Sequence, residues 1–330
     1  SAGVGVVIVL QLMRLAQCFG RGGTWGGGIL MAYENVPENK RSFYAAIPQI
    51  GLPIGFGLSS ILIAVPTLLL PEDIFFTWGW RIPFLAAIIL TLIVIRQKGE
   101  MMETEDYKKA QAKLEAEEAE GKKHKVGFIP MVKGYWKTLL LGCGTRWVDG
   151  TFYNIFIVWI LSYCINWLGM PLIQTYIITI IACIFKIPFT LFGGWCAQKL
   201  GNTRTFVIGA LASAVLSIPT LKVIELSKGN LAITIIGIVL GWSIAYNLIW
   251  AVISSLWSSY FETEVRYSGI SFVYHVPSFL VAGMVPTICT LLINYGNGDT
   301  IYVGIYSTVV ALISAACALA LKARHDRGEK

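Results

Sequence analysis

Residues 145–154 read TRWVDGTFYN, a polar island inside a long apolar run. On a helix, Arg146 and Asp149 are three residues apart and Tyr153 is four further on, so their side chains share one face. With a rise of about 1.5 Å per residue, Arg146 lies roughly 13 Å and Asp149 roughly 18 Å beyond Lys137, the charge that precedes the run. Both depths are near the middle of a hydrocarbon layer about 30 Å thick. This face therefore points away from lipid.

A charged side chain at this depth costs at least about 2.5 kcal/mol, so it normally faces a water-filled cavity or a partner. Two interpretations of the polar island follow. Either Arg146 and Asp149 neutralise each other and only hold helices together, or the island, with Tyr153 and Asn154, belongs to a substrate or proton site. We favour the second, because ionisable residues inside a membrane usually mark functional sites.

The composition is that of an integral membrane protein rather than a soluble globule. Of the 330 residues, 55% are hydrophobic and 14% are charged, whereas a soluble domain has about 25% charged residues. The apolar runs mostly reach about 18 residues or more, which predicts an all-α fold of spanning helices rather than a barrel. The net charge of +7 fits basic cytoplasmic loops, so we expect contact with membrane lipid and none with nucleic acid.

The sequence indicates neither a metal site nor a cofactor site. The seven cysteines are scattered singly and the three histidines are dispersed, so no ligand-spaced cluster occurs. No nucleophile with its base is apparent either, which argues against a membrane-embedded enzyme. We therefore expect no cofactor and no metal.

Hydropathy along the chain predicts nine spans. The connections between them alternate between basic and acidic or neutral, so the basic side, which includes the C-terminal tail, is expected to be cytoplasmic. The predicted spans are residues 5–33, 43–70, 79–96, 136–165, 171–196, 203–224, 230–257, 267–294 and 301–322.

One composition break divides the chain into two parts. Residues 97–135 are rich in charged helix formers, which is typical of a solvated cytoplasmic segment between two bundles. We expect a partial bundle of three spans in residues 1–96, a six-span bundle in residues 136–323 and a cytoplasmic tail in residues 324–330. A weak internal repeat supports two related bundles, as in many transporters.

Several motifs resemble those of one transporter family. Residues 14–17 (RLAQ), 22–28 (GGTWGGG), 79–85 (GWRIPFL) and 262–270 (ETEVRYSGI) occur in this order. Together they resemble the major facilitator superfamily, and more narrowly its metabolite:proton symporter branch, which includes carriers of shikimate, α-ketoglutarate, and proline or betaine. The resemblance implies spans four to twelve of a two-bundle fold, truncated to nine membrane helices, and a longer parent without which the fragment does not transport. Gln17 enters the candidate site through the first motif.

Arg14 and Lys186 are two further cations inside predicted spans. Arg14 lies roughly 13 Å inside the first span, and Lys186 lies too deep for snorkelling. With Arg146 against Asp149, they predict a net positive cavity that favours a carboxylate, which an arginine can bind in a bidentate manner. A zwitterion with its ammonium on Asp149 is the other option. Two plainer roles stay open: a structural role for Arg14, and Lys186 capping helix carbonyls near Pro188.

The later spans add polar and aromatic candidates. Asn247 and Trp250 are three residues apart and can share a face towards the cavity, although aromatic residues at this spacing also pack as core. Tyr246, in the same predicted span, and Tyr274, in the next one, are further aromatic residues. His275 is a candidate proton carrier because imidazole titrates near neutral pH, but a single histidine is more often structural.

A cytoplasmic gate is the second site that the resemblance implies. Residues 193–204 (GGWCAQKLGNTR) resemble the superfamily's cytoplasmic loop signature, with a glutamine where an aspartate usually stands. Surface ion pairs worth about 0–1 kcal/mol each would break when this gate opens, with Arg41 paired to Glu34 and Arg204 to Glu262. The predicted gate residues are Glu34, Arg41, Gln198, Arg204, Glu262 and Arg266.

The sequence predicts a secondary active transporter. Asp149 takes up and releases a proton while Arg14, Arg146 and Lys186 hold a carboxylate, and two bundles rock around them. The alternatives are a proton-independent facilitator of the same fold, a membrane-embedded enzyme, and a channel, which needs rings of pore residues from several subunits. We expect a monomer in a bacterial inner membrane, with protons and a small carboxylate or zwitterionic metabolite as partners.

Overall fold

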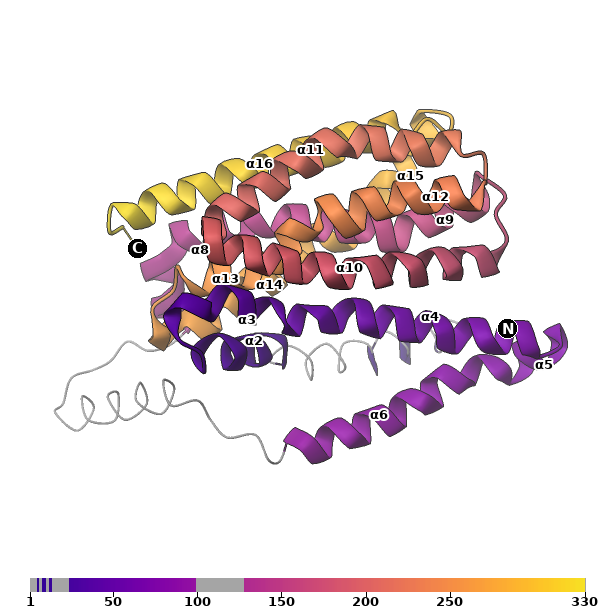
Figure 1. The fold of residues 1–330 in the computed structure, drawn as a ribbon, viewed down its shortest axis with the longest axis horizontal. Helices are drawn as coiled ribbons and strands as arrows, with labels where there is room; N and C mark the ends of the chain where they lie inside the picture. Colours follow the sequence, from indigo (N-terminus) through magenta and orange to yellow (C-terminus); the bar gives the residue numbers. More distant parts are fainter. Residues whose placement is uncertain (1–4, 6–7, 10–11, 14–23, 99–127, 330) are drawn as a thin grey trace.

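The structure is a computed structural model that describes residues 5, 8–9, 12–13, 24–98 and 128–329. These residues form helices joined by short turns (Figure 1). Within them, eight helical stretches are long and apolar enough to cross a membrane, and each overlaps a predicted span. The stretches are Arg41–Leu69, Gly79–Arg96, Met131–Asn166, Leu172–Leu200, Asn202–Leu226, Leu231–Ser258, Val265–Tyr295 and Ile301–Asp326.

Two sequence predictions fall largely outside the described residues. The first predicted span is described mainly at its end, where α2 (Thr24–Glu34) is helical. The predicted linker overlaps the described part only at its two ends. There α6 (Ile82–Lys98) runs to residue 98 and α8 (Phe128–Tyr153) begins at residue 128, with an irregular backbone at Tyr135. The division into bundles and linker stays a prediction.

The last six candidate spans pack side by side around a common core (Figure 1). Bulky side chains with no exposed surface, such as Trp242 and Ile249, fill this core. After α8 the spans comprise η4 (Asn154–Trp159), α9 (Ile160–Asn166), α10 (Leu172–Leu200), α11 (Asn202–Leu226), α12 (Leu231–Ile238), η5 (Val239–Ala245), α13 (Asn247–Ser258), α14 (Thr263–Leu280), η6 (Ala282–Met284), α15 (Val285–Tyr295) and α16 (Ile301–Asp326).

Two of these spans contain a π-helical turn, η4 and η5, which the hydrophobic periodicity does not predict. A π-helical turn has one residue more per hydrogen-bonded loop than an α-helix, so it rotates the side chains that follow. Such turns are frequent at functional sites. Here η5 carries Trp242 and leads directly into Tyr246, and both matter for the site described below.

The earlier helices lie along one side of this bundle (Figure 1). The helices α3 and α4 follow α10 closely, whereas α6 diverges from the bundle and none of its residues 82–96 is buried. The elements between α2 and α6 are η1 (Glu38–Lys40), α3 (Arg41–Ala46), η2 (Pro48–Ile50), α4 (Gly51–Leu69), α5 (Glu72–Thr77) and η3 (Gly79–Arg81).

Small residues allow the two parts of the molecule, the earlier helices α2–α6 and the bundle of the last six spans, to approach closely. A Cβ atom added at Gly194 of α10 would lie 2.7 Å from the Cβ of Ala46 and 3.4 Å from the carbonyl oxygen of Phe43. A Cβ at Gly57 of α4 would lie 3.5 Å from the Cβ of Cys183. Glycine at position 194 is therefore needed for α3 to lie against α10 as it does, the usual role of small residues between membrane helices.

A charged cluster joins the end of α11 to the start of α16. The ammonium of Lys222 lies 2.6 Å from Oδ1 of Asp299 and 3.0 Å from Oε1 of Glu225. Glu225 also accepts hydrogen bonds from the backbone N–H and the hydroxyl of Thr300, at 2.8 and 2.7 Å. The hydrogen bond from Lys222 holds the pKa of Asp299, in the connecting turn, below its usual value. This cluster therefore fixes the turn between two spans.

Replacing Asp299 should remove a small, pH-dependent part of the stability. Because the folded-state pKa of Asp299 is lowered, its contribution is present above the unfolded carboxyl pKa of about 4 and is lost as the pH falls through the folded value. Asp299→Asn should therefore slightly lower Tm at pH 7 in detergent and flatten its decline below about pH 4. Asp73→Asn, at an exposed position near the start of α5, is the control, and equal acid slopes for all three proteins would contradict the prediction.

Candidate functional site

Asp149 lies at the centre of a buried polar cluster. Only 1% of its surface is exposed. Its two carboxylate oxygens accept hydrogen bonds from different helices: Oδ2 from Nη1 of Arg146, one turn earlier on α8, and Oδ1 from the hydroxyl of Tyr246, just before α13. The i,i+3 spacing seen in the sequence is thus a buried ion pair, and a tyrosine from another span completes it.

Arg146 extends the cluster to a third helix. Its Nη2 lies 3.2 Å from the hydroxyl oxygen of Ser278, and its guanidinium lies over the ring of Tyr274, 4.4 Å from the centroid; both partners are on α14. Gly150 makes room for this arrangement, since a Cβ there would lie 3.0 Å from the Cβ of Ala282 and 3.6 Å from Nη1 of Arg146. Cation–π contact and an ion pair together hold the buried guanidinium.

Lys186 on α10 is fully buried on the other side of Tyr246. Its Nζ lies 4.3 Å from the ring centroid of Tyr246 and 4.4 Å from that of Trp242. Among the described residues, Nζ has no hydrogen-bond partner. The alternative in which Lys186 caps carbonyls near Pro188 is therefore wrong, because the ammonium faces two aromatic rings and α10 continues through the proline.

Asn247 ties α13 to α10 next to this lysine. Its Nδ2 donates to the carbonyl oxygen of Lys186 at 2.8 Å and to the hydroxyl of Thr190 at 3.0 Å. The side chain of Asn247 is fully buried. The predicted candidates Arg146, Asp149, Lys186 and Asn247 are thus brought together from three spans, with Asn247 holding the backbone that carries the lysine.

Trp250 joins the two parts of the molecule. Its indole Nε1 donates to the carbonyl oxygen of Gln49 at 3.1 Å, and the Gln49 side chain donates back to the carbonyl oxygen of Trp250 at 3.3 Å. Both residues are buried. Gln49 belongs to η2, so this reciprocal pair connects the earlier helices to α13. The sequence gives no sign of Gln49, because its partner is about two hundred residues away.

The remaining site candidates lie at the edges of the cluster. Tyr153 is half-buried, with its ring 5.8 Å from that of Phe56 on α4. Asn154 donates to the carbonyl oxygen of Gly150 at 2.8 Å, within its own helix. His275 is exposed, and its ring lies 5.1 Å from that of the adjacent tyrosine. Arg14 and Gln17 lie outside the described residues.

Three of the six predicted gate residues lie near Tyr33 or at the end of α10. The guanidinium of Arg41 lies 5.4 Å and that of Arg266 5.8 Å from the Tyr33 ring centroid. Gln198 accepts a hydrogen bond from the backbone N–H of Phe43 at 3.3 Å, across the two parts of the molecule. Arg204 and Glu262 are both exposed, and the side chain of Glu34 lies outside what the structure describes. The two predicted ion pairs stay predictions.

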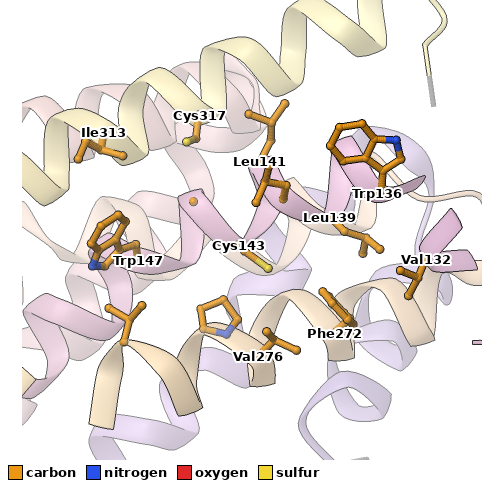
Figure 2. A pocket seen from close by; sticks show the side chains of 14 residues that line it. Val132, Trp136, Leu139, Leu141, Cys143, Trp147, Phe272, Val276, Ile313 and Cys317 are labelled. Carbon is orange, nitrogen blue, oxygen red and sulfur yellow. The ribbon is translucent and has the colours of Figure 1, made fainter. Parts of the chain in front are cut away.

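A large apolar groove lies elsewhere, between α8, α14 and α16 (Figure 2). Its volume is about 600 Å³, and no charged side chain lines it. A carboxylate entering it would lose hydration and meet no cation, since the only N–H donors among its lining side chains are the indoles of Trp136 and Trp147. The groove is therefore no candidate for a polar substrate. The side chains that Figure 2 labels are Val132, Trp136, Leu139, Leu141, Cys143, Trp147, Phe272, Val276, Ile313 and Cys317.

The pattern of the sequence over most of the chain matches one family model. Residues 2–286 match the model of the Major Facilitator Superfamily. The chain belongs to this superfamily. Its fold agrees with that assignment: it aligns with the crystal structure of a D-xylose-proton symporter with a TM-score of 0.60 at 16% identity, covering 87% of this chain and 64% of that one.

Two curated relatives show the range of superfamily members to which the chain is similar. It is 29% identical over 322 residues to the shikimate transporter of Escherichia coli (strain K12), covering 96% of this chain and 70% of that protein. It is 26% identical over 329 residues to the proline/betaine transporter of the same strain, covering 99% of this chain and 65% of that protein. Membership makes the protein a multi-span membrane transporter rather than an enzyme.

The sequence does not predict three residues that contact the charged cluster or join the earlier helices to the bundle. Trp242, Ser278 and Gln49 sit among many similar residues in apolar runs, and only the packing of helices brings them to the charged cluster or to the contact between the two parts. A partial signal exists for Trp242, since it lies four residues before Tyr246 and can share its face of the helix.

A double-mutant cycle should show that Arg146 and Asp149 are one buried unit. Arg146→Met and Asp149→Leu should each destabilise the protein by about 3 kcal/mol or more, because each leaves a buried charge unpaired. The double variant should recover most of this loss, since an apolar pair replaces both charges. Thermal midpoints of the four proteins in detergent measure the effect, and additive losses in the double variant would contradict it.

Proposed function

We propose that the protein is a proton-coupled symporter of a small organic anion, with a zwitterion as the second candidate substrate. The observation that carries the proposal is a set of buried hydrogen-bond donors that no described protein acceptor satisfies. Among the described residues, Nε of Arg146, Nζ of Lys186 and Nε1 of Trp242 are buried without a hydrogen-bond partner. Unused donors next to two cations favour a ligand rich in acceptors, such as a carboxylate.

Asp149 is the proposed proton carrier. Its carboxylate is the acid that faces both Arg146 and Tyr246, so its charge decides what Arg146 can do. When a proton adds to Asp149, the neutral acid no longer holds the guanidinium, and Arg146 can bind a substrate carboxylate through two N–H donors. When the proton leaves, the ion pair between Asp149 and Arg146 forms again and the substrate is released. One shared cation thereby couples two ligands.

Alternating access would change the contact between the two parts of the molecule. That contact contains the reciprocal hydrogen bonds of Gln49 with Trp250 and the bond from Phe43 to Gln198. Each is worth only about 0.5–1.5 kcal/mol net, so a few of them bias a conformational equilibrium without locking it. Arg14 and Gln17 join the proposed substrate site, and Tyr153, Asn154 and His275 its edge.

The proposed setting follows from charge and surface. The basic connections favour a C-terminus on the cytoplasmic side of a bacterial inner membrane. We propose that the protein is a monomer there. The apolar groove of Figure 2 suits an acyl chain of membrane lipid. Exposed Lys133 and Lys137 are next in sequence to its lining residues Val132 and Trp136.

Uptake into proteoliposomes tests the coupling. We expect the natural full-length protein to accumulate a labelled anion, with shikimate as the first probe, only when an inward proton gradient is imposed. Asp149→Asn should abolish accumulation, at least about tenfold, because the neutral amide cannot exchange a proton. Asp73→Asn, which neutralises an exposed acid instead, should leave it unchanged. Equal uptake with and without the gradient would reduce the protein to a facilitator.

A further inference from the structure

The ammonium of Lys186 occupies an aromatic cage. The ring centroids of Trp242 and Tyr246 lie 4.4 and 4.3 Å from Nζ, which is well within cation–π range. All three side chains are buried almost completely. Rings arranged in this way around a cation are the usual means by which proteins recognise quaternary ammonium groups. In this chain the place of such a group is taken by the protein's own lysine.

The cage is also short of acceptors. Within the described part of the chain, neither Nζ of Lys186 nor Nε1 of Trp242 has a hydrogen-bond partner. Asp149 does not serve them: its oxygens accept from Arg146 and Tyr246, and neither Nζ of Lys186 nor Nε1 of Trp242 is hydrogen-bonded to it. Both unsatisfied groups are donors, so a ligand that completes the cage must bring acceptors, and a second cation there would meet the ammonium of Lys186.

We infer that Lys186 is a specificity-determining residue, which blocks the aromatic cage of Trp242 and Tyr246 to quaternary ammonium substrates and directs a substrate carboxylate to itself and Trp242. This inference rests on the proposed function and narrows its substrate class. The substrate is an organic anion without a compensating cation. Zwitterions such as betaine are excluded as substrates. Lys186 occupies the two rings and Arg146 occupies the Asp149 carboxylate, so no group is left to bind their positive end.

Removing the lysine should open the cage to the cation that it resembles. Lys186→Ala removes the side chain beyond Cβ, which has the same number of heavy atoms as a trimethylammonium group. The space between the two rings is then free for such a group. Tetramethylammonium should therefore bind the detergent-solubilised variant at least about tenfold more tightly than it binds the natural protein, as measured by isothermal titration calorimetry. Lys186→Met should show no gain, since its side chain still fills the cage.

The matched control is a lysine on a tryptophan at the surface. Lys199 lies 4.3 Å from the Trp195 ring centroid, but both residues are exposed. Lys199→Ala should therefore leave tetramethylammonium binding as weak as in the natural protein. Adding Trp242→Leu to Lys186→Ala should abolish the gain, since it removes one wall of the cage.

Three results would overturn the inference. The first is natural protein that binds tetramethylammonium or glycine betaine as tightly as Lys186→Ala does. The second is tighter tetramethylammonium binding that persists after Trp242 is also replaced. The third is unchanged binding by a Lys186→Ala protein that is folded, as shown by monodisperse elution and cooperative thermal unfolding. If that variant does not fold, Lys186→Ser is titrated in its place. Because binding is measured without a gradient, proton-independent uptake would refute the proposed symport and leave this titration standing.

Discussion

The shared carboxylate of Asp149 is the interaction on which the rest of the site depends. It holds Arg146 on its own helix and Tyr246 on another, and the Tyr246 ring in turn faces Lys186. Three spans thus meet around one acid in the membrane interior. Buried ion pairs are weak evidence for stability, because desolvation offsets much of their attraction. A charge cluster that gains little stability is better explained by a role in binding and exchange.

The spans were predictable because their signal is local. Eight apolar stretches found in the sequence recur as helices in the described residues, since length and hydropathy alone decide whether a segment can cross a membrane. The pair Arg146 and Asp149 was predictable for the same reason, as i,i+3 residues on one helix share a face. Lys186 was recognised only as a buried cation that lacked a neighbour in sequence.

The partners from other helices were not predictable in this way. Trp242 lies on the π-helical turn η5 and Tyr246 directly after it, and both face Lys186 on another span. Gln49 meets Trp250 where glycine at position 194 lets the earlier helices approach α10. Both depend on rotations and separations between helices, which no periodicity encodes. Superfamily membership identifies the protein as a transporter. Whether its substrate is an anion or a zwitterion depends on contacts between side chains from different helices.

Proton uptake on binding tests the central role of Asp149 most directly. The anion that the uptake assay identifies would be added to the natural protein in weakly buffered detergent with a pH-indicator dye. Because Arg146 must leave Asp149 to bind the anion, we predict uptake of about one proton for each anion bound, and none for Asp149→Asn at the same occupancy. Equal proton uptake by both proteins, or none by the natural one, would contradict the proposed coupling.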